Sequence, residues 1–302
     1  MAPPPQLPEP AEAFAARAVP SSTTFKPNIL AGKVVFCTGG GSGICYRIVE
    51  VLLAHGATAA IMGRKADRLS AAAKQLSEST RRKCIATPGD VRKYDDVEKA
   101  VDATVKEFGR LDMVVCGAAG NFLAPIEGIS PNGFKTVQEI DLLGTYHTVK
   151  ATLEHLKRSH GSYVHISATL HYTAIPWQAA PSAAKAGVDA LSNSIAVEFG
   201  PFGIRSNCIA PGMIQGTEGA DRLTPKGAED LVVSRIPTQR MGQKDDIANA
   251  ALFLFSDAGN YINGTQIVVD GGAKHFPGPW LPYPDSSLDK QGVKELVMGS
   301  KL

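Results

Sequence analysis

Short apolar segments alternate with amphipathic helical segments from Lys33 to Gly272, and this alternation most constrains the fold. The apolar segments read KVVFCTGG, ATAAIMGR, CIATPGDV, LDMVVCGAAG, SYVHISA, IRSNCIAPG and TQIVVDGG. The segment from Val188 to Phe199 carries apolar residues at helical spacing. Short apolar strands that alternate with helices are typical of a parallel sheet with helices on both faces. The sequence therefore predicts one doubly wound α/β domain with a sheet of about seven strands.

No internal repeat or linker divides this domain. We expect a flexible Pro-rich leader over residues 1–30, one domain over 31–276 and a C-terminal tail over 277–302. No apolar run approaches the roughly 18 residues of a membrane-spanning helix. We therefore expect no transmembrane segment.

The charge balance and the cysteines exclude several classes of function. Lysine and arginine total 31 against 29 acidic residues, which leaves a net charge of only +2. Nucleic-acid binding normally needs a concentrated basic surface, so we expect no nucleic-acid partner. The 5 cysteines lack CxxC or Cys/His ligand spacing, which indicates reduced thiols in an intracellular compartment and no metal.

The given sequence ends in Ser300, Lys301 and Leu302. A C-terminal Ser-Lys-Leu is an address that a peroxisomal import receptor binds. We expect that receptor as a partner and the peroxisomal matrix as the location. The alternative is an ordinary helix end.

A glycine-rich turn follows the first predicted strand and opens a helix, from Thr38 to Ile44. Glycines at such a place let the backbone approach a pyrophosphate, which binds against exposed helix N–H groups. A purely structural turn is the alternative.

Four ordered motifs resemble the short-chain dehydrogenases/reductases, a family with a Rossmann fold. They are Thr38-Gly39-x-x-x-Gly43-Ile44, Gly117-Ala118-Ala119-Gly120, Arg205-x-Asn207-x-Ile209-x-Pro211-Gly212 and Asp270-Gly271-Gly272. The resemblance implies a nicotinamide cofactor and a homotetramer. Two positions depart from the family pattern. Cys45 stands where a third glycine is usual, and Gly117 replaces the first Asn of an Asn-Asn-Ala-Gly segment.

The type of cofactor is predicted from the end of the second strand. An acidic residue about 20 positions past the glycines would bind the ribose 2′-hydroxyl of NAD. This chain has Arg64 there, and a guanidinium suits the 2′-phosphate of NADPH. The alternative is a solvated surface arginine.

With the resemblance added, the expected cofactor-binding residues follow the motifs along the chain. They are Gly39, Gly40, Gly41, Ser42, Gly43, Ile44, Arg64, Arg68, Asp90, Val91, Ala118, Gly120, Lys185, Pro211, Gly212, Ile214, Gly216 and Thr217.

The usual proton donors of the family are missing. Its ketone reductases carry Tyr-x-x-x-Lys, with a Ser thirteen residues before the Tyr. Lys185 fits the lysine, but Pro181 stands at the Tyr position and Ala168 at the Ser position. Two interpretations compete: a catalytically inactive relative, or a reaction that needs no phenol beside the hydride acceptor. Reduction of a conjugated dienoyl thioester is such a reaction, because its new negative charge runs to a remote oxygen.

Further segments resemble the peroxisomal 2,4-dienoyl-CoA reductases within this family. They include Ala118 to Phe122, Ser130 to Phe134, Ile140-Asp141 and Ile166 to Leu170. The resemblance implies that Asp141 and Lys185 are the catalytic pair. Our hypothesis is that they orient a water that protonates the dienolate. A surface carboxylate at Asp141 is the alternative.

The expected substrate is a fatty dienoyl-CoA, whose phosphates call for basic residues at the entrance. By resemblance these are Arg64, Arg92 and Arg222, with Phe122, Ser130, Pro131 and Asn132 along the acyl path. Tyr172 is expected as an amphipathic wall residue. The predicted function is NADPH-dependent reduction of 2,4-dienoyl-CoA to 3-enoyl-CoA in peroxisomal β-oxidation. The alternatives are a reductase of another acyl-CoA or carbonyl substrate and an inactive NADP-binding scaffold.

Overall fold

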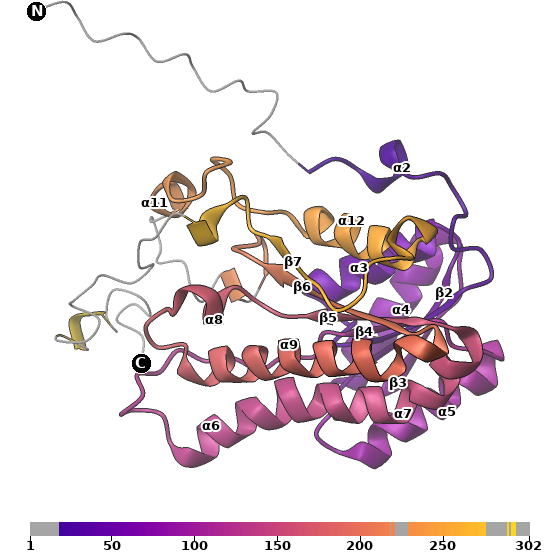
Figure 1. Ribbon diagram of the computed structural model, residues 1–302, viewed down its shortest axis with the longest axis horizontal. Helices are drawn as coiled ribbons and strands as arrows, with labels where there is room; N and C mark the ends of the chain where they lie inside the picture. Colours follow the sequence, from indigo (N-terminus) through magenta and orange to yellow (C-terminus); the bar gives the residue numbers. More distant parts are fainter. Residues whose placement is uncertain (1–17, 218, 221–228, 276–288, 290, 294–302) are drawn as a thin grey trace, which may run out of the picture.

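The computed structural model describes residues 18–217, 219–220, 229–275, 289 and 291–293 (Figure 1). They form a doubly wound domain around a parallel sheet of 7 strands, in the order β3-β2-β1-β4-β5-β6-β7. The strands are β1 (Val34–Thr38), β2 (Thr58–Gly63), β3 (Cys84–Pro88), β4 (Met113–Cys116), β5 (Ser162–Ile166), β6 (Arg205–Pro211) and β7 (Gln266–Val269). The order reverses between β1 and β4, so the predicted Rossmann architecture is confirmed.

Helices cover both faces of the sheet, as Figure 1 shows. One face carries α3 (Gly43–Ala54), α4 (Ala66–Thr80) and α12 (Lys244–Phe255), and the other carries α5 (Tyr94–Phe108), α7 (Gly144–Ser159) and α9 (Ala179–Phe199). The shorter elements are α2 (Ser21–Thr24), α6 (Pro131–Gln138), a π-helical turn (Glu139–Leu143), α8 (Leu170–Thr173), α11 (Glu229–Ser234), and 3₁₀ turns at Gly200–Phe202, Asp257–Gly259 and Ala273–His275. No helix among the described residues is long and apolar enough to cross a bilayer.

The central strands are buried on both faces, which explains their continuous apolar sequences. Side chains alternate along β1: Val35 and Cys37 pack in the cluster beneath α3 and α12, whereas Phe36 packs in the cluster on the opposite face. All five cysteines are free and buried, as expected for small apolar residues. Packing on both faces of the sheet holds the carboxyl ends of the strands in place, and residues at these ends line the site described below.

Residues 18–30 of the predicted leader contact the domain. The Ala18 amide donates to Gln243 Oε1 (3.1 Å), Asn249 Nδ2 donates to the Val19 carbonyl (2.8 Å), and His55 Nε2 lies 3.1 Å from Ser21 Oγ. Residues 1–17, most of the predicted tail and its C-terminal tripeptide lie outside the described residues. Within the tail, Val293 is buried against Trp177.

A buried histidine makes the stability of the fold depend on pH. His165 on β5 is fully buried and lies 3.0 Å from Ser206 Oγ through Nε2. Burial lowers the pKa of His165 from 6.5 to about 4. Below pH 6.5 the unfolded chain binds a proton that the folded chain does not, so stability falls as pH falls towards 4.

We expect His165 to cost about 2 kcal/mol of unfolding free energy between pH 7 and pH 5, with the loss continuing toward pH 4. Urea unfolding of the native protein and a His165→Gln variant at both pH values measures this contribution. The variant has no titrating ring, so its loss should be smaller by that amount. Equal losses in the two proteins would contradict the assignment.

Candidate active site

A cavity of about 930 Å³ lies at the carboxyl ends of the central strands. The ends of β5 and β6 contribute Ile166 and Pro211, and the start of α9 contributes Gln178, Pro181 and Lys185. Open α/β sheets bind their ligands at this edge, beside the point where the strand order reverses. The cavity is therefore the candidate site.

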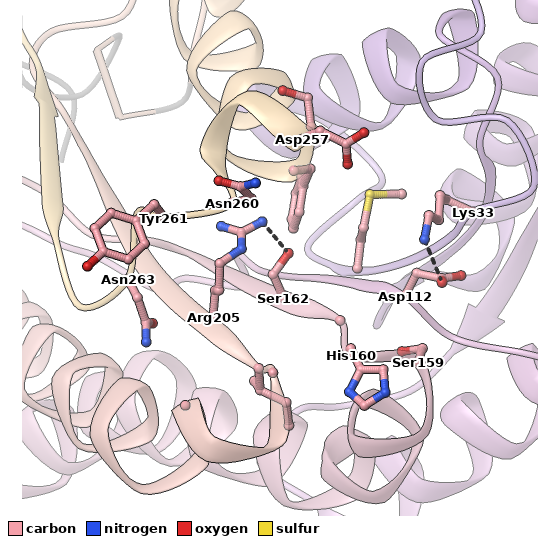
Figure 2. A pocket seen from close by; sticks show the side chains of 17 residues that line it. Lys33, Asp112, Ser159, His160, Ser162, Arg205, Asp257, Asn260, Tyr261 and Asn263 are labelled. Atoms are coloured by element: carbon pink, nitrogen blue, oxygen red, sulfur yellow. Dashed lines mark hydrogen bonds and ion pairs between the residues drawn. The ribbon is translucent and has the colours of Figure 1, made fainter.

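A second hollow, of about 570 Å³, lies at the amino ends of the strands (Figure 2). Its cations are already paired: Lys33 Nζ lies 3.6 Å from Asp112, and Arg205 donates to the Leu254 carbonyl at 2.8 Å. Among the predicted site residues that the structure describes, none lines this hollow.

The glycine turn after β1 has the shape of a pyrophosphate cradle. Gly39 and Gly43 adopt φ values of 73° and 63°, which side-chain-bearing residues rarely take. A Cβ on Gly39 would lie 2.8 Å from the Gly117 carbonyl oxygen. The helix α3 begins at Gly43, and its N-cap Ser42 makes no side-chain capping bond. The N–H groups at this helix end therefore remain available for an anion, which fits a dinucleotide.

The two departures from the family pattern face each other beneath this turn. A Cβ on Gly117 would overlap the thiol sulfur of Cys45, which is buried. The thiol thus occupies the space that a side chain at position 117 would need. The cysteine in the glycine turn is accommodated because position 117 has no side chain.

The end of β2 places exposed basic residues beside the turn. Arg64 is exposed directly after β2, and Arg68 is exposed on the first turn of α4. The main partner of the Asp90 carboxylate is Arg92, whose Nε donates to both of its oxygens at 3.0 Å. The Arg92 guanidinium holds the pKa of Asp90 below its usual range, and the positive charge of Arg64 contributes to lowering this pKa.

Asp141 and Lys185 meet inside the cavity. Lys185 Nζ lies 3.1 Å from Asp141 Oδ2 and donates to the Ile166 carbonyl at 2.9 Å. Asp141 is 1% exposed, and its Oδ1 accepts the Gly120 amide at 2.7 Å. The alternative of a surface carboxylate is wrong. Buried ion pairs that line a cavity are uncommon, so Asp141 and Lys185 are the candidate functional pair of this site.

A π-helical turn sets the position of this aspartate. Residues Glu139–Leu143 join α6 to α7 with a wider backbone turn than an α-helix. Thr145 Oγ1 donates to the Asp141 carbonyl at 2.6 Å. Single π-helical turns are frequent at functional sites, and here the turn directs the carboxylate to Gly120 and Lys185.

A second polar cluster lies one helical turn beyond Lys185. Tyr172 Oη and His171 Nε2 both bond to Asp189 Oδ2, at 2.7 and 2.8 Å. Burial, and then the Asp189 carboxylate, raises the pKa of the Tyr172 phenol. Tyr172 lines the cavity, as expected for a wall residue, but its hydroxyl is engaged by Asp189.

Three further groups of predicted residues differ in how they relate to the cavity. Ile44, Pro211, Gly212, Ile214 and Thr217 line the cavity with Asp141 and Lys185. Phe122 and Ser130 to Asn132 are exposed and do not line it within the described part of the chain, and Ser130 Oγ caps α6 by accepting the Gly133 amide at 3.0 Å. Arg222 lies outside the described residues.

The sequence reasoning missed an amide pair in the cavity wall. Asn121 Nδ2 donates to Gln178 Oε1 at 2.9 Å, and both residues line the cavity. They are 57 positions apart in the sequence. The resemblance pointed to the segment containing Asn121, but no local pattern singled out Gln178.

A glycine turn shaped for a pyrophosphate, beside a buried lysine and carboxylate, is typical of nicotinamide-dependent oxidoreductases. Residues 39–274 match the family described as enoyl-(acyl carrier protein) reductase. The chain belongs to the short-chain dehydrogenase/reductase family, whose members take a nicotinamide cofactor.

Two curated relatives are named for the same activity. The chain is 48% identical to the peroxisomal 2,4-dienoyl-CoA reductase [(3E)-enoyl-CoA-producing] of Saccharomyces cerevisiae, over 84% of this chain and 88% of that one. It is 45% identical to the Arabidopsis thaliana protein of that description, over 90% and 92%. Among solved structures, a short-chain type dehydrogenase/reductase from Mycobacterium ulcerans matches with a TM-score of 0.80 and 30% identity, over 90% of this chain and 99% of that one.

Proposed function

We propose that this protein reduces 2,4-dienoyl-CoA to 3-enoyl-CoA with NADPH. The observation that carries the proposal is the buried Asp141–Lys185 pair, in a cavity whose wall has Ala168 and Pro181 where ketone reductases need hydroxyls. The curated relatives named as 2,4-dienoyl-CoA reductases support it.

The chemistry explains why no phenol is needed beside the hydride acceptor. The nicotinamide cofactor supplies a hydride, which is added to a remote carbon of the conjugated chain. The electron pair runs to the thioester oxygen, and one proton must then be returned to carbon. Asp141 and Lys185 face the cavity together, and their role in this proposal is to orient the water that delivers that proton.

The preference for NADPH rests on the basic end of β2. Arg64 is exposed there, beside the glycine turn, where a 2′-phosphate would lie. We expect Arg64→Glu to lower the ratio of kcat/KM with NADPH to kcat/KM with NADH by about a hundredfold, because a salt-bridged contact becomes a repulsion.

Steady-state rates with both cofactors at a fixed dienoyl-CoA concentration measure the ratio. Lys74→Glu, on the exposed side of α4, introduces the same charge change away from the turn and should leave the ratio near the native value. An unchanged ratio in Arg64→Glu would remove Arg64 from the cofactor site.

The loss of NADPH absorbance with 2,4-hexadienoyl-CoA tests the function itself. Turnover of this substrate supports the proposal. Turnover of a ketoacyl-CoA alone would favour a carbonyl reductase, and binding of NADPH without turnover of either would favour a scaffold.

The proposal extends to location and assembly. The curated relatives carry the word peroxisomal in their names, which supports a location in the peroxisomal matrix. The Ser300-Lys301-Leu302 sequence is the type of signal that the peroxisomal import receptor binds. Family membership supports a homotetramer, which sedimentation of the purified protein would measure.

A further inference from the structure

A fully buried amide faces the cavity from the start of α9. Gln178 is 0% exposed, and its Nε2 has no hydrogen-bond partner among the described residues. A buried N–H group without an acceptor is destabilising and rare in folded proteins, so such groups normally bind something. The cavity that Gln178 lines is where that partner would lie.

The fold holds this amide in a fixed orientation. Asn121 Nδ2 donates to Gln178 Oε1 at 2.9 Å, which leaves the two Nε2 hydrogens for another acceptor. The Gln178 carbonyl accepts the Ser182 amide at 2.9 Å and so begins α9. Gln178, Pro181 and Lys185 follow at i, i+3 and i+7, and all three line the cavity. Gln178 therefore lies on the lysine side of the helix, just before the residue that replaces the tyrosine.

Few other donors in the cavity wall remain for an acceptor on the substrate. Lys185 Nζ is engaged by Asp141 and the Ile166 carbonyl, and Tyr172 Oη by Asp189. Ala168, Leu170 and Pro181 have no side-chain donor. Ser167 Oγ is also buried without a partner in the described chain and is the first competing donor, and the cavity wall carries the Thr169 hydroxyl and the Lys274 ammonium as well.

We propose that Gln178 Nε2 donates a hydrogen bond to the thioester carbonyl oxygen of the dienoyl-CoA. The inference rests on the proposed function and names a further catalytic residue for it. As the hydride is added, negative charge gathers on this oxygen, and a donor already in place stabilises the dienolate more than the ground state. Asn121 acts as the positioning residue, because it turns the Gln178 amide so that nitrogen faces the substrate.

The test uses Gln178→Met, which keeps the side-chain length but removes the donor, and Gln178→Glu, which keeps an acceptor for Asn121. With 2,4-hexadienoyl-CoA and NADPH, we expect both variants to lose kcat by roughly a hundredfold, with little change in the affinity for NADPH. Gln266→Met on β7, which does not line the cavity, is the matched control and should keep the native rate.

A spectroscopic signal separates this role from a structural one. Hydrogen bonding polarises the conjugated thioester, so hexadienoyl-CoA bound with NADP⁺ should absorb at a longer wavelength in the native protein than in Gln178→Met. Thermal unfolding midpoints verify that the variants are folded. Native kcat and a native absorption shift in Gln178→Met would overturn the proposal. If the absorption shift is lost in Ser167→Ala but kept in Gln178→Met, the proposal is also overturned, and Ser167 is the donor to the thioester oxygen. Absence of dienoyl-CoA turnover in the native protein would instead refute the proposed function.

Discussion

Asp141→Ala is expected to lower the rate of dienoyl-CoA reduction by about a thousandfold, within the range found for lost proton-transfer groups. The substitution removes the carboxylate that lies 3.1 Å from Lys185 Nζ and accepts the Gly120 amide. A water in the cavity would then lose one of its two charged partners, and the lysine would lose its counter-charge. Single-turnover absorbance of NADPH measures the loss.

A second substitution separates the charge from the shape. Asp141→Asn keeps an oxygen for the Gly120 amide and holds nearly the same volume, so we expect a folded protein with a rate between those of the native and alanine forms. Asp102→Ala, an exposed aspartate on α5, is the control and should have the native rate. Full reductase rate in Asp141→Ala would end the assignment of this carboxylate.

Gly117→Asn is expected to destabilise the domain by about 3 kcal/mol, at the upper end of the usual cost of overpacking. The new Cβ would overlap the Cys45 sulfur, and backbone and strand atoms enclose the position. The backbone at Gly39 packs against the Gly117 carbonyl so closely that a Cβ on Gly39 would lie 2.8 Å from that oxygen. A shift of the backbone at position 117 would therefore distort the cofactor turn and weaken NADPH binding. Urea unfolding and NADPH titration measure the two effects.

The compensating substitution makes this prediction specific. Cys45→Gly alone leaves a small cavity and a more flexible first turn of α3, which should cost about 1 kcal/mol. Cys45→Gly combined with Gly117→Asn restores the pairing usual in the family, so the double variant should be more stable than Gly117→Asn alone. Additive losses in the double variant would contradict the coupling.

The sequence was sufficient to predict the sheet because the information is local. Each strand contains a short apolar segment, and the glycines from Gly39 to Gly43 lie in a recognisable turn. The fold and this turn could therefore be placed directly. Asp141 and Lys185 were paired by resemblance, and the structure brings them to 3.1 Å.

Contacts between distant segments could not be predicted in this way. The segment after β4 contacts α3 through Gly117 and Cys45, and it contacts the start of α9 through Asn121 and Gln178. No periodic pattern in the sequence encodes these contacts. The acyl-path residues Ser130 to Asn132 illustrate the opposite case. Their segment matched a family pattern, but in the structure Ser130 serves as a helix cap and the segment is exposed.

The contacts of residues 18–30 bear on where a shortened protein should begin. Gln243 both receives the Ala18 amide and forms the capping box of α12 with Asp246. Removing residues 1–30 would take Ser21 away from His55 and would also remove the buried side chain of Leu30. A boundary upstream of Ala18 keeps the first turn of α12 and the end of α3 shielded, and it removes only residues that precede these contacts.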